Sequence, residues 1–298
     1  MGKLGIIIPI IKFNKFSISA IKKISNEDNY ENLVFFFIVS NNVVADELKS
    51  HIIGIKNEFK IIVANNYSSN FLRSYAQKVN TQYVFFHDCD DIADYKYLNE
   101  FIGNRYIANN EVICFNVKKI LLDHDDKTIK EKIIFPLRNY FVKTIETLPT
   151  CVYSKIIPLD LIKGINFPNL PFTQDWAISY QLYNICSNHK FINNVVYYYY
   201  NYPSSSSQSY LDNKIRLLRV QAYSRNIINE YLVKNKKFEA EFLKFRYNNV
   251  LFNRFRRINI IIKPYFVSLN FFLKSNFRTR LSIIFQSMKK ICLIIYQK

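Results

Sequence analysis

Residues 83–91, with the sequence YVFFHDCDD, join a short apolar run directly to three acids within four positions. A continuous apolar run of this length is typical of a strand that is buried on both faces, as in a parallel sheet. Apolar runs and helical patterns alternate before it, at 4–11, 17–24, 33–39, 45–56, 60–64 and 70–79. This alternation predicts an α/β domain with right-handed crossovers between parallel strands.

The three acids after this run, Asp88, Asp90 and Asp91, indicate a ligand site. Ligands of α/β sheets bind beyond the carboxyl ends of the strands, where these acids stand. Neighbouring carboxylates repel one another unless a cation compensates them. Hard oxygen ligands suit Mg²⁺ or Mn²⁺, which bridge to diphosphates. The alternative is a cap for a helix predicted at 95–108, but one acid is enough for a cap. We therefore expect a metal site.

The composition excludes several classes of protein. Of the 298 residues, 49% are hydrophobic and 21% charged, so disorder is not the main state. The five glycines are too widely spaced for a Gly-rich phosphate loop. The five cysteines form no CxxC pair, which leaves no sign of a zinc ribbon or a disulfide framework and favours the cytosol. The short N-terminal apolar run is expected to be a strand rather than a signal peptide, and no transmembrane span is expected.

The net charge of +18 predicts an anionic partner, such as a phosphorylated substrate, a membrane surface or nucleic acid. Residues 242–298 hold twelve Lys and Arg and no acid, together with many aromatic residues. This pattern fits peripheral binding to an anionic membrane. It fits equally a helical appendage that packs on the α/β domain with its basic face in solvent. Nucleic acid is less favoured because no nucleic-acid-binding motif is present.

The second half of the chain has a less regular pattern. Helices are expected at 158–163 and 175–186, and strands at 111–120, 129–134 and 191–200. The acids of 123–126 are interpreted as solvated turn residues, and helices are expected from about residue 211. We divide the chain into an α/β domain at 1–210, with halves of about 1–95 and 96–210, and a basic helical region at 211–298.

Residues 65–91, NNYSSNFLRSYAQKVNTQYVFFHDCDD, resemble the nucleotide-sugar region of family-2 glycosyltransferases. Arg73 matches the Arg of the family's Ala-Arg-Asn element, and Asp88 and Asp90 match the two acids of its DxD motif. Residues 6–9, 30–39 and 165–175 resemble the first strand, the second strand and the element that carries the catalytic base. The resemblance covers about residues 3–210 in order, and it implies a nucleotide-sugar half of about 1–95 and an acceptor half of about 96–210. It implies a GT-A-like (Rossmann-like) fold, with a mixed, mostly parallel sheet flanked by helices.

The resemblance also implies roles for individual residues. Asp175 is implied as the general base, and Asp90 with Asp88 as the ligands of Mn²⁺ or Mg²⁺. Trp176 and Tyr200 are candidates for acceptor binding. The donor would be bound by Pro9, Ser40, Asn41, Arg73, Asp88 and Asp90. The alternatives are a helix cap for Asp175 and a core position for Trp176.

The sequence departs from the family pattern at three positions. Asn41 stands where the family has an acid that contacts the nucleotide base, and an amide still offers a donor and an acceptor to a uracil edge. Gln174 replaces the Glu that precedes the catalytic Asp. Asn201 replaces an Arg that often follows the Tyr-rich strand, which weakens the phosphate contact expected there.

These features predict an inverting, metal-dependent glycosyltransferase, because one base and one metal imply a single displacement. The expected donor is a UDP-sugar. The expected acceptor is a hydroxyl of a bacterial glycan or glycolipid, such as lipooligosaccharide or capsule, at the cytoplasmic face of the inner membrane. One alternative is a sugar-nucleotide nucleotidyltransferase, although the Gly-rich N-terminal loop is missing. The other is a non-catalytic membrane- or nucleic-acid-binding protein on the same fold, which the lost acid after Val39 favours.

Overall fold

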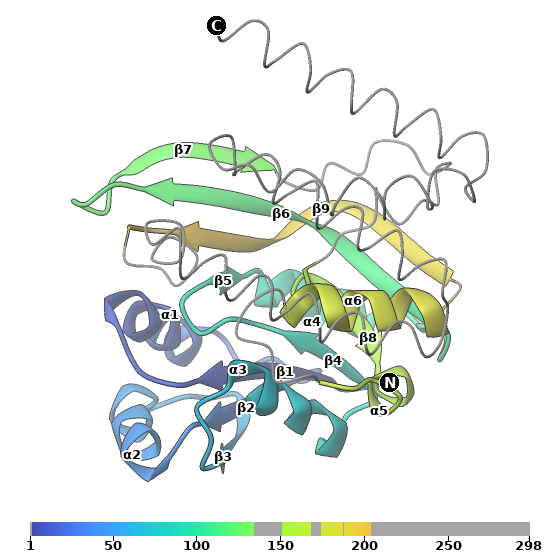
Figure 1. The fold of residues 1–298 in the computed structure, drawn as a ribbon, viewed down its shortest axis with the longest axis horizontal. Coiled ribbons are helices and arrows are strands. Elements are labelled where there is room, and N and C mark those ends of the chain that lie inside the picture. Colours follow the sequence, from blue (N-terminus) through green and yellow to red (C-terminus); the bar gives the residue numbers. More distant parts are fainter. Residues whose placement is uncertain (1, 134–150, 168–173, 187, 204–298) are drawn as a thin grey trace, which may run out of the picture. The chain divides into compact units, whose positions relative to one another are not determined.

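The computed structural model of the chain describes residues 2–133, 151–167, 174–186 and 188–203 (Figure 1). Residues 204–210 and the basic region predicted at 211–298 lie outside these residues. The proposed domain boundary near residue 210 therefore stays a prediction. Within the described residues, no helix is both long enough and apolar enough to cross a membrane.

Strands and helices alternate in the first part of the chain, as the sequence predicts. The elements in order are β1 (Leu4–Ile10), α1 (Lys15–Asn26), β2 (Leu33–Val39), α2 (Asn42–His51), β3 (Glu58–Val63), α3 (Ser69–Ser74), the 3₁₀ helix η1 (Tyr75–Lys78) and β4 (Tyr83–Phe86). The four strands lie side by side in the order β3-β2-β1-β4, and every pair is parallel. Parallel strands need a crossover connection, and each crossover here carries a helix.

The sheet continues beyond β4 with mixed pairing. The later elements are β5 (Ile92–Ala93), α4 (Tyr95–Gly103), β6 (Glu111–Leu122), β7 (Thr128–Ile133), β8 (Lys155–Pro158), α5 (Leu159–Lys163), α6 (Gln174–Ile185) and β9 (Asn188–Asn201). The order after β4 is β8-β6-β9-β5, and β7 pairs with β6. β9 runs parallel to β6, whereas the pairs made by β5, β7 and β8 are antiparallel. The predicted class, a mixed α/β sheet flanked by helices, is confirmed.

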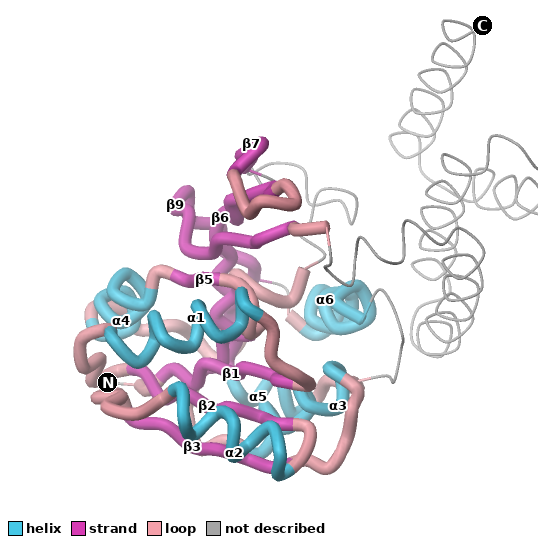
Figure 2. The backbone as a smooth tube through the Cα atoms, turned by 90° about the vertical axis from the view of Figure 1, so that its left-hand side faces the viewer, coloured by secondary structure: helices cyan, strands magenta, loops and turns pink. Residues whose placement is uncertain are grey.

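Helices cover both faces of the sheet (Figure 2). Successive side chains of a strand point to opposite faces, so β2 feeds two separate cores. Its residues Leu33, Phe35, Phe37 and Val39 pack with α1, α2 and α4. The residues between them pack with α3, α5 and α6. This burial on both faces explains why β2 is apolar at every position.

Several boundaries differ from those predicted. The helix expected at 45–56 runs from Asn42 to His51, because the Asn41 side chain caps it by accepting from the Val44 N–H at 3.0 Å. The helix expected at 95–108 ends at Gly103. β5 and β8 were not predicted, and Pro158, expected to begin a helix, ends β8 instead. β8 is a short strand between β4 and β6, and pairing with those neighbours defines it.

Candidate active site

The acidic loop, residues 88–91, leaves the sheet at the point where the strand order reverses. β1 lies between β2 and β4, and the helices that follow β1 and β3 pack on opposite faces of the sheet. Open α/β sheets bind ligands at such switch points, beyond the carboxyl ends of the strands. The loop closes as a turn, with the Asp91 N–H donating to the Asp88 carbonyl at 3.0 Å.

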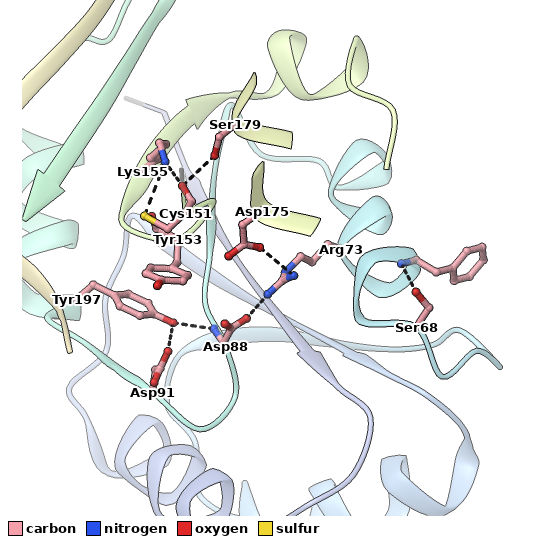
Figure 3. A network of polar contacts seen from close by, with 11 residues as sticks. Ser68, Arg73, Asp88, Asp91, Cys151, Tyr153, Lys155, Asp175, Ser179 and Tyr197 are labelled. Carbon is pink, nitrogen blue, oxygen red and sulfur yellow. Dashed lines mark hydrogen bonds and ion pairs between the residues drawn. The ribbon is translucent and has the colours of Figure 1, made fainter. Parts of the chain in front are cut away.

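Arg73 of α3 joins two of the predicted carboxylates, Asp88 and Asp175 (Figure 3). Its Nη2 donates to Asp88 Oδ1 at 2.5 Å, and its Nη1 lies 3.3 Å from Asp175 Oδ1. The Arg73 side chain is only 7% exposed, whereas about a quarter of each acid is exposed. The fold therefore brings together three residues that the sequence assigned to one site.

The charges of this cluster depend on one another. Burial lowers the pKa of Arg73, but the Asp88 and Asp175 carboxylates together raise this pKa by more than burial lowers it. The guanidinium therefore remains a cation. Burial raises the pKa of Asp175 above its ordinary value, while Arg73 opposes the rise and the Val152 N–H stabilises the carboxylate with a hydrogen bond. A carboxylate with a raised pKa is suited to act as a general base near neutral pH.

Lys155 is a second buried cation near Asp175, and sequence reasoning missed it. Its side chain is 1% exposed, and its Nζ donates to the Cys151 carbonyl. The Ser179 hydroxyl of α6 donates to the same carbonyl at 3.1 Å (Figure 3). Lys155 lowers the pKa of Asp175, although burial raises it more. Burial raises the pKa of the Cys151 thiol to about 11, so this thiol stays protonated. The lysine is the one charged residue of segment 151–158, and this was the available signal.

Asp91, the third acid of the loop, is a structural residue. Its side chain is 1% exposed, and burial raises its pKa well above the ordinary value. It accepts hydrogen bonds from the Tyr197 hydroxyl at 2.7 Å and from the Tyr200 N–H at 2.9 Å. The Tyr197 oxygen also accepts from the Asp88 N–H at 2.9 Å (Figure 3). β9 thus fixes the loop, and Tyr200, predicted to bind acceptor, contacts it through its backbone.

Asp90 and Asp88 are the two acids that remain available to a cation. Asp90 Oδ2 accepts from the Tyr202 hydroxyl at 2.5 Å, and Asp88 Oδ1 is held by Arg73. Burial raises the pKa of Asp90, although the Tyr202 hydrogen bond opposes this rise.

The two carboxylates limit the kind of cation that these residues fit. The described part of the chain holds no group of three or more His, Cys, Asp or Glu residues placed to bind a metal ion. Mg²⁺ is commonly bound by one or two carboxylates, with substrate phosphates and water completing its shell. The two acids therefore fit a cation that shares its coordination with a diphosphate, and they do not form a closed protein cage.

The other predicted donor-binding residues lie at the ends of neighbouring strands and already have structural contacts. Pro9 is buried in β1. The Ser40 hydroxyl donates to the Ile11 carbonyl at 2.8 Å. Besides capping α2, Asn41 donates from its amide to the Tyr67 hydroxyl at 3.1 Å. Contact of these residues with a nucleotide stays a prediction.

Two further residues belong to α6 and to the position directly after β4. Trp176 belongs to α6, but its side chain lies outside the part that the structure describes, so its predicted acceptor role stays a prediction. His87 is fully buried beside the Tyr95 hydroxyl, 3.1 Å from its Nε2. Burial lowers the pKa of His87 to about 4, despite the charge of Asp88, so the imidazole is neutral.

The fold has counterparts among solved structures. Neither a protein-family model nor a curated protein matches the sequence. The crystal structure of S. aureus TarS 1–349 is similar, with a TM-score of 0.55 and 14% identity over 91% of this chain and 79% of that one. The same protein with UDP-GlcNAc gives a TM-score of 0.55 at 14% identity, over 93% of this chain and 77% of that one. TarS 1–349 in complex with UDP gives a TM-score of 0.52 at 13% identity, over 95% of this chain and 78% of that one. The chain therefore shares its fold with TarS.

Proposed function

We propose that this chain is a nucleotide-sugar glycosyltransferase that works by inversion and needs a divalent cation, with a UDP-sugar as donor. The observation that carries the proposal is the meeting of Arg73, Asp88 and Asp175 at the carboxyl ends of the parallel strands. The fold shared with TarS, which has been crystallised with UDP-GlcNAc and with UDP, supports the same donor class.

Sugar transfer requires that the diphosphate leaving group be neutralised. We assign this task to Mn²⁺ or Mg²⁺ held by Asp90 and Asp88, since a bound cation acts as a Lewis acid and a template for the phosphates. Arg73 is buried beside Asp88 and supplies a fixed positive charge to the same region. The family-2 assignment rests on the order of sequence motifs.

The acceptor hydroxyl must lose its proton as it attacks the sugar. Asp175 is the proposed base because it is partly exposed, lies in the first turn of α6 and has a pKa raised by burial. With one base and no second carboxylate assigned as nucleophile, the reaction is a single displacement with inversion. General-base help of this kind contributes about 10²–10⁴-fold to a rate.

The acceptor and the cellular location are proposed from the sequence alone. A bacterial surface glycan or glycolipid remains the proposed acceptor. The excess of basic residues in 242–298 supports attachment to the cytoplasmic face of the inner membrane.

A ligand screen followed by an activity assay tests the proposal. Nucleotide sugars are screened by thermal shift with and without Mn²⁺, since a ligand that binds the folded state raises its melting temperature. The proposal expects stabilisation by a UDP-sugar with Mn²⁺, release of UDP during turnover, and loss of turnover in D90A and D175A. Release of pyrophosphate would identify a nucleotidyltransferase instead. Unchanged activity in both variants would overturn the assignment.

A further inference from the structure

We propose that Tyr202 is a positioning residue that fixes the Asp90 carboxylate for cation binding, so that the end of β9 forms part of the donor site. The inference rests on the proposed function, because it concerns the acid assigned to the cation. Tyr202 directly follows β9, is 5% exposed and matches no element of the family pattern quoted above.

Tyr202 ties together three segments that are distant in sequence. Its hydroxyl donates to Asp90 Oδ2 at 2.5 Å and accepts from Asn14 Nδ2 at 3.0 Å. Its ring stacks on Phe16 of α1, with the ring centroids 4.0 Å apart. The residues after β1, after β4 and after β9 are therefore joined at a single hydroxyl group.

The direction of these hydrogen bonds is fixed by Asn14. As the N-cap of α1, Asn14 accepts with its Oδ1 from the Phe16 and Ser17 N–H groups, both at 2.9 Å. Its Nδ2 is then the atom that faces Tyr202, and an amide NH₂ only donates. The Tyr202 oxygen must accept this bond, so its own proton is left for Asp90. The carboxylate is thereby held through one oxygen.

This arrangement matters most when Asp90 binds a cation. Ligating carboxylates are normally oriented by hydrogen bonds from an outer shell, and removing such a partner typically weakens metal affinity about 10–100-fold. A purely structural hydroxyl would behave differently. Its loss would lower the stability of the fold and leave the cation affinity unchanged.

The variant Y202F separates these roles, because it keeps the ring on Phe16 and removes only the hydroxyl. The probe is Mn²⁺, followed by electron paramagnetic resonance with and without UDP, on the full chain. We expect Mn²⁺ binding in the presence of UDP to weaken about 10–100-fold. UDP binding without metal should not change. The matched control is Y198F on β9, the strand that Tyr202 follows, because the Tyr198 hydroxyl has no hydrogen-bond partner among the described residues.

A second variant keeps the test decisive if Y202F does not fold. Ser caps helices as well as Asn, so N14S preserves α1 while it removes the amide that directs the Tyr202 proton. We expect a smaller loss of Mn²⁺ affinity in the same direction. One outcome would refute the role of Tyr202 and leave the proposed function standing. In that outcome, wild type binds Mn²⁺ with UDP and D90N does not, but Y202F and N14S both bind Mn²⁺ as wild type does. If wild type does not bind Mn²⁺ with UDP, both fail.

Discussion

Arg73 lies 3.3 Å from Asp175 and holds Asp88 with the same guanidinium group. One buried cation thus contacts both the proposed base and an acid of the proposed donor site. Because the two carboxylates raise the pKa of Arg73 while Arg73 opposes the rise in the pKa of Asp175, their charges are coupled. The two halves of the proposed reaction are therefore linked at Arg73.

The first prediction concerns the base. D175N keeps the size of the side chain but removes its ability to accept a proton. With the donor that the ligand screen selects, the rate of UDP release should fall about 10²–10⁴-fold. The affinity for UDP, measured by calorimetry, should change little because Asp175 is not assigned to the donor.

The matched control for this prediction is D160N. Asp160 also lies in the first turn of a helix, but its side chain is 67% exposed and, within the described residues, forms an ion pair with Lys163 alone, at 3.4 Å. Its replacement should leave turnover unchanged. A D175N protein with wild-type turnover would exclude Asp175 as the base.

The second prediction concerns stability. R73M leaves Asp88 and Asp175 without their buried cation, and removal of one partner of a buried pair typically costs about 3–5 kcal/mol of unfolding free energy. Urea unfolding measures the loss. Adding D88N and D175N to R73M should restore part of it, because the uncompensated charges are then gone.

An exposed ion pair provides the comparison for R73M. Lys49 and Asp46 lie 2.8 Å apart on the surface of α2, with 64% and 72% of their side chains exposed. K49M should cost less than about 1 kcal/mol, as is usual for surface pairs. Equal losses in K49M and R73M would contradict the idea that burial makes Arg73 important.

The third prediction concerns pH. Lys155 lowers the pKa of Asp175, so K155M should raise that pKa beyond the value that burial already sets. Because the base must be deprotonated to act, the acidic limb of the profile of kcat/KM should move to higher pH. K163M, at an exposed lysine of α5, is the control and should leave the limb in place. A shift to lower pH in K155M, or none, would refute the electrostatic role of Lys155.

The parallel strands could be predicted from sequence because β1, β2 and β4 are buried on both faces and are apolar throughout. β5 and β8 have two and four residues, too few to show any periodicity. Their state is set by pairing with β9, β4 and β6, which are distant in sequence. Local patterns therefore could not reveal them.

The residues of the candidate site also divide into those that the sequence could place and those that it could not. Arg73, Asp88 and Asp175 could be placed from motif order, and the structure brings them together. Tyr197 and Tyr202 could not be singled out from the sequence, because residues 197–202 hold five tyrosines. Alternate residues of a strand face opposite sides, so the pairing register of β9 decides that Tyr197 reaches Asp91. Tyr202 reaches Asp90 through the path of the chain after β9, which no local pattern shows.

The last prediction separates two roles of Asn41. The structure shows that its side chain caps α2, whereas contact with a uracil edge is predicted from sequence. N41S keeps the cap, because Ser serves as well as Asn at this position, but loses the amide. If Asn41 contacts the base, UDP affinity should fall by one hydrogen bond, about 0.5–1.5 kcal/mol or roughly 2–10-fold. Pyrophosphate with Mn²⁺ has no base, so its affinity should not change. Equal losses for both ligands, or none, would leave the cap as the role of Asn41.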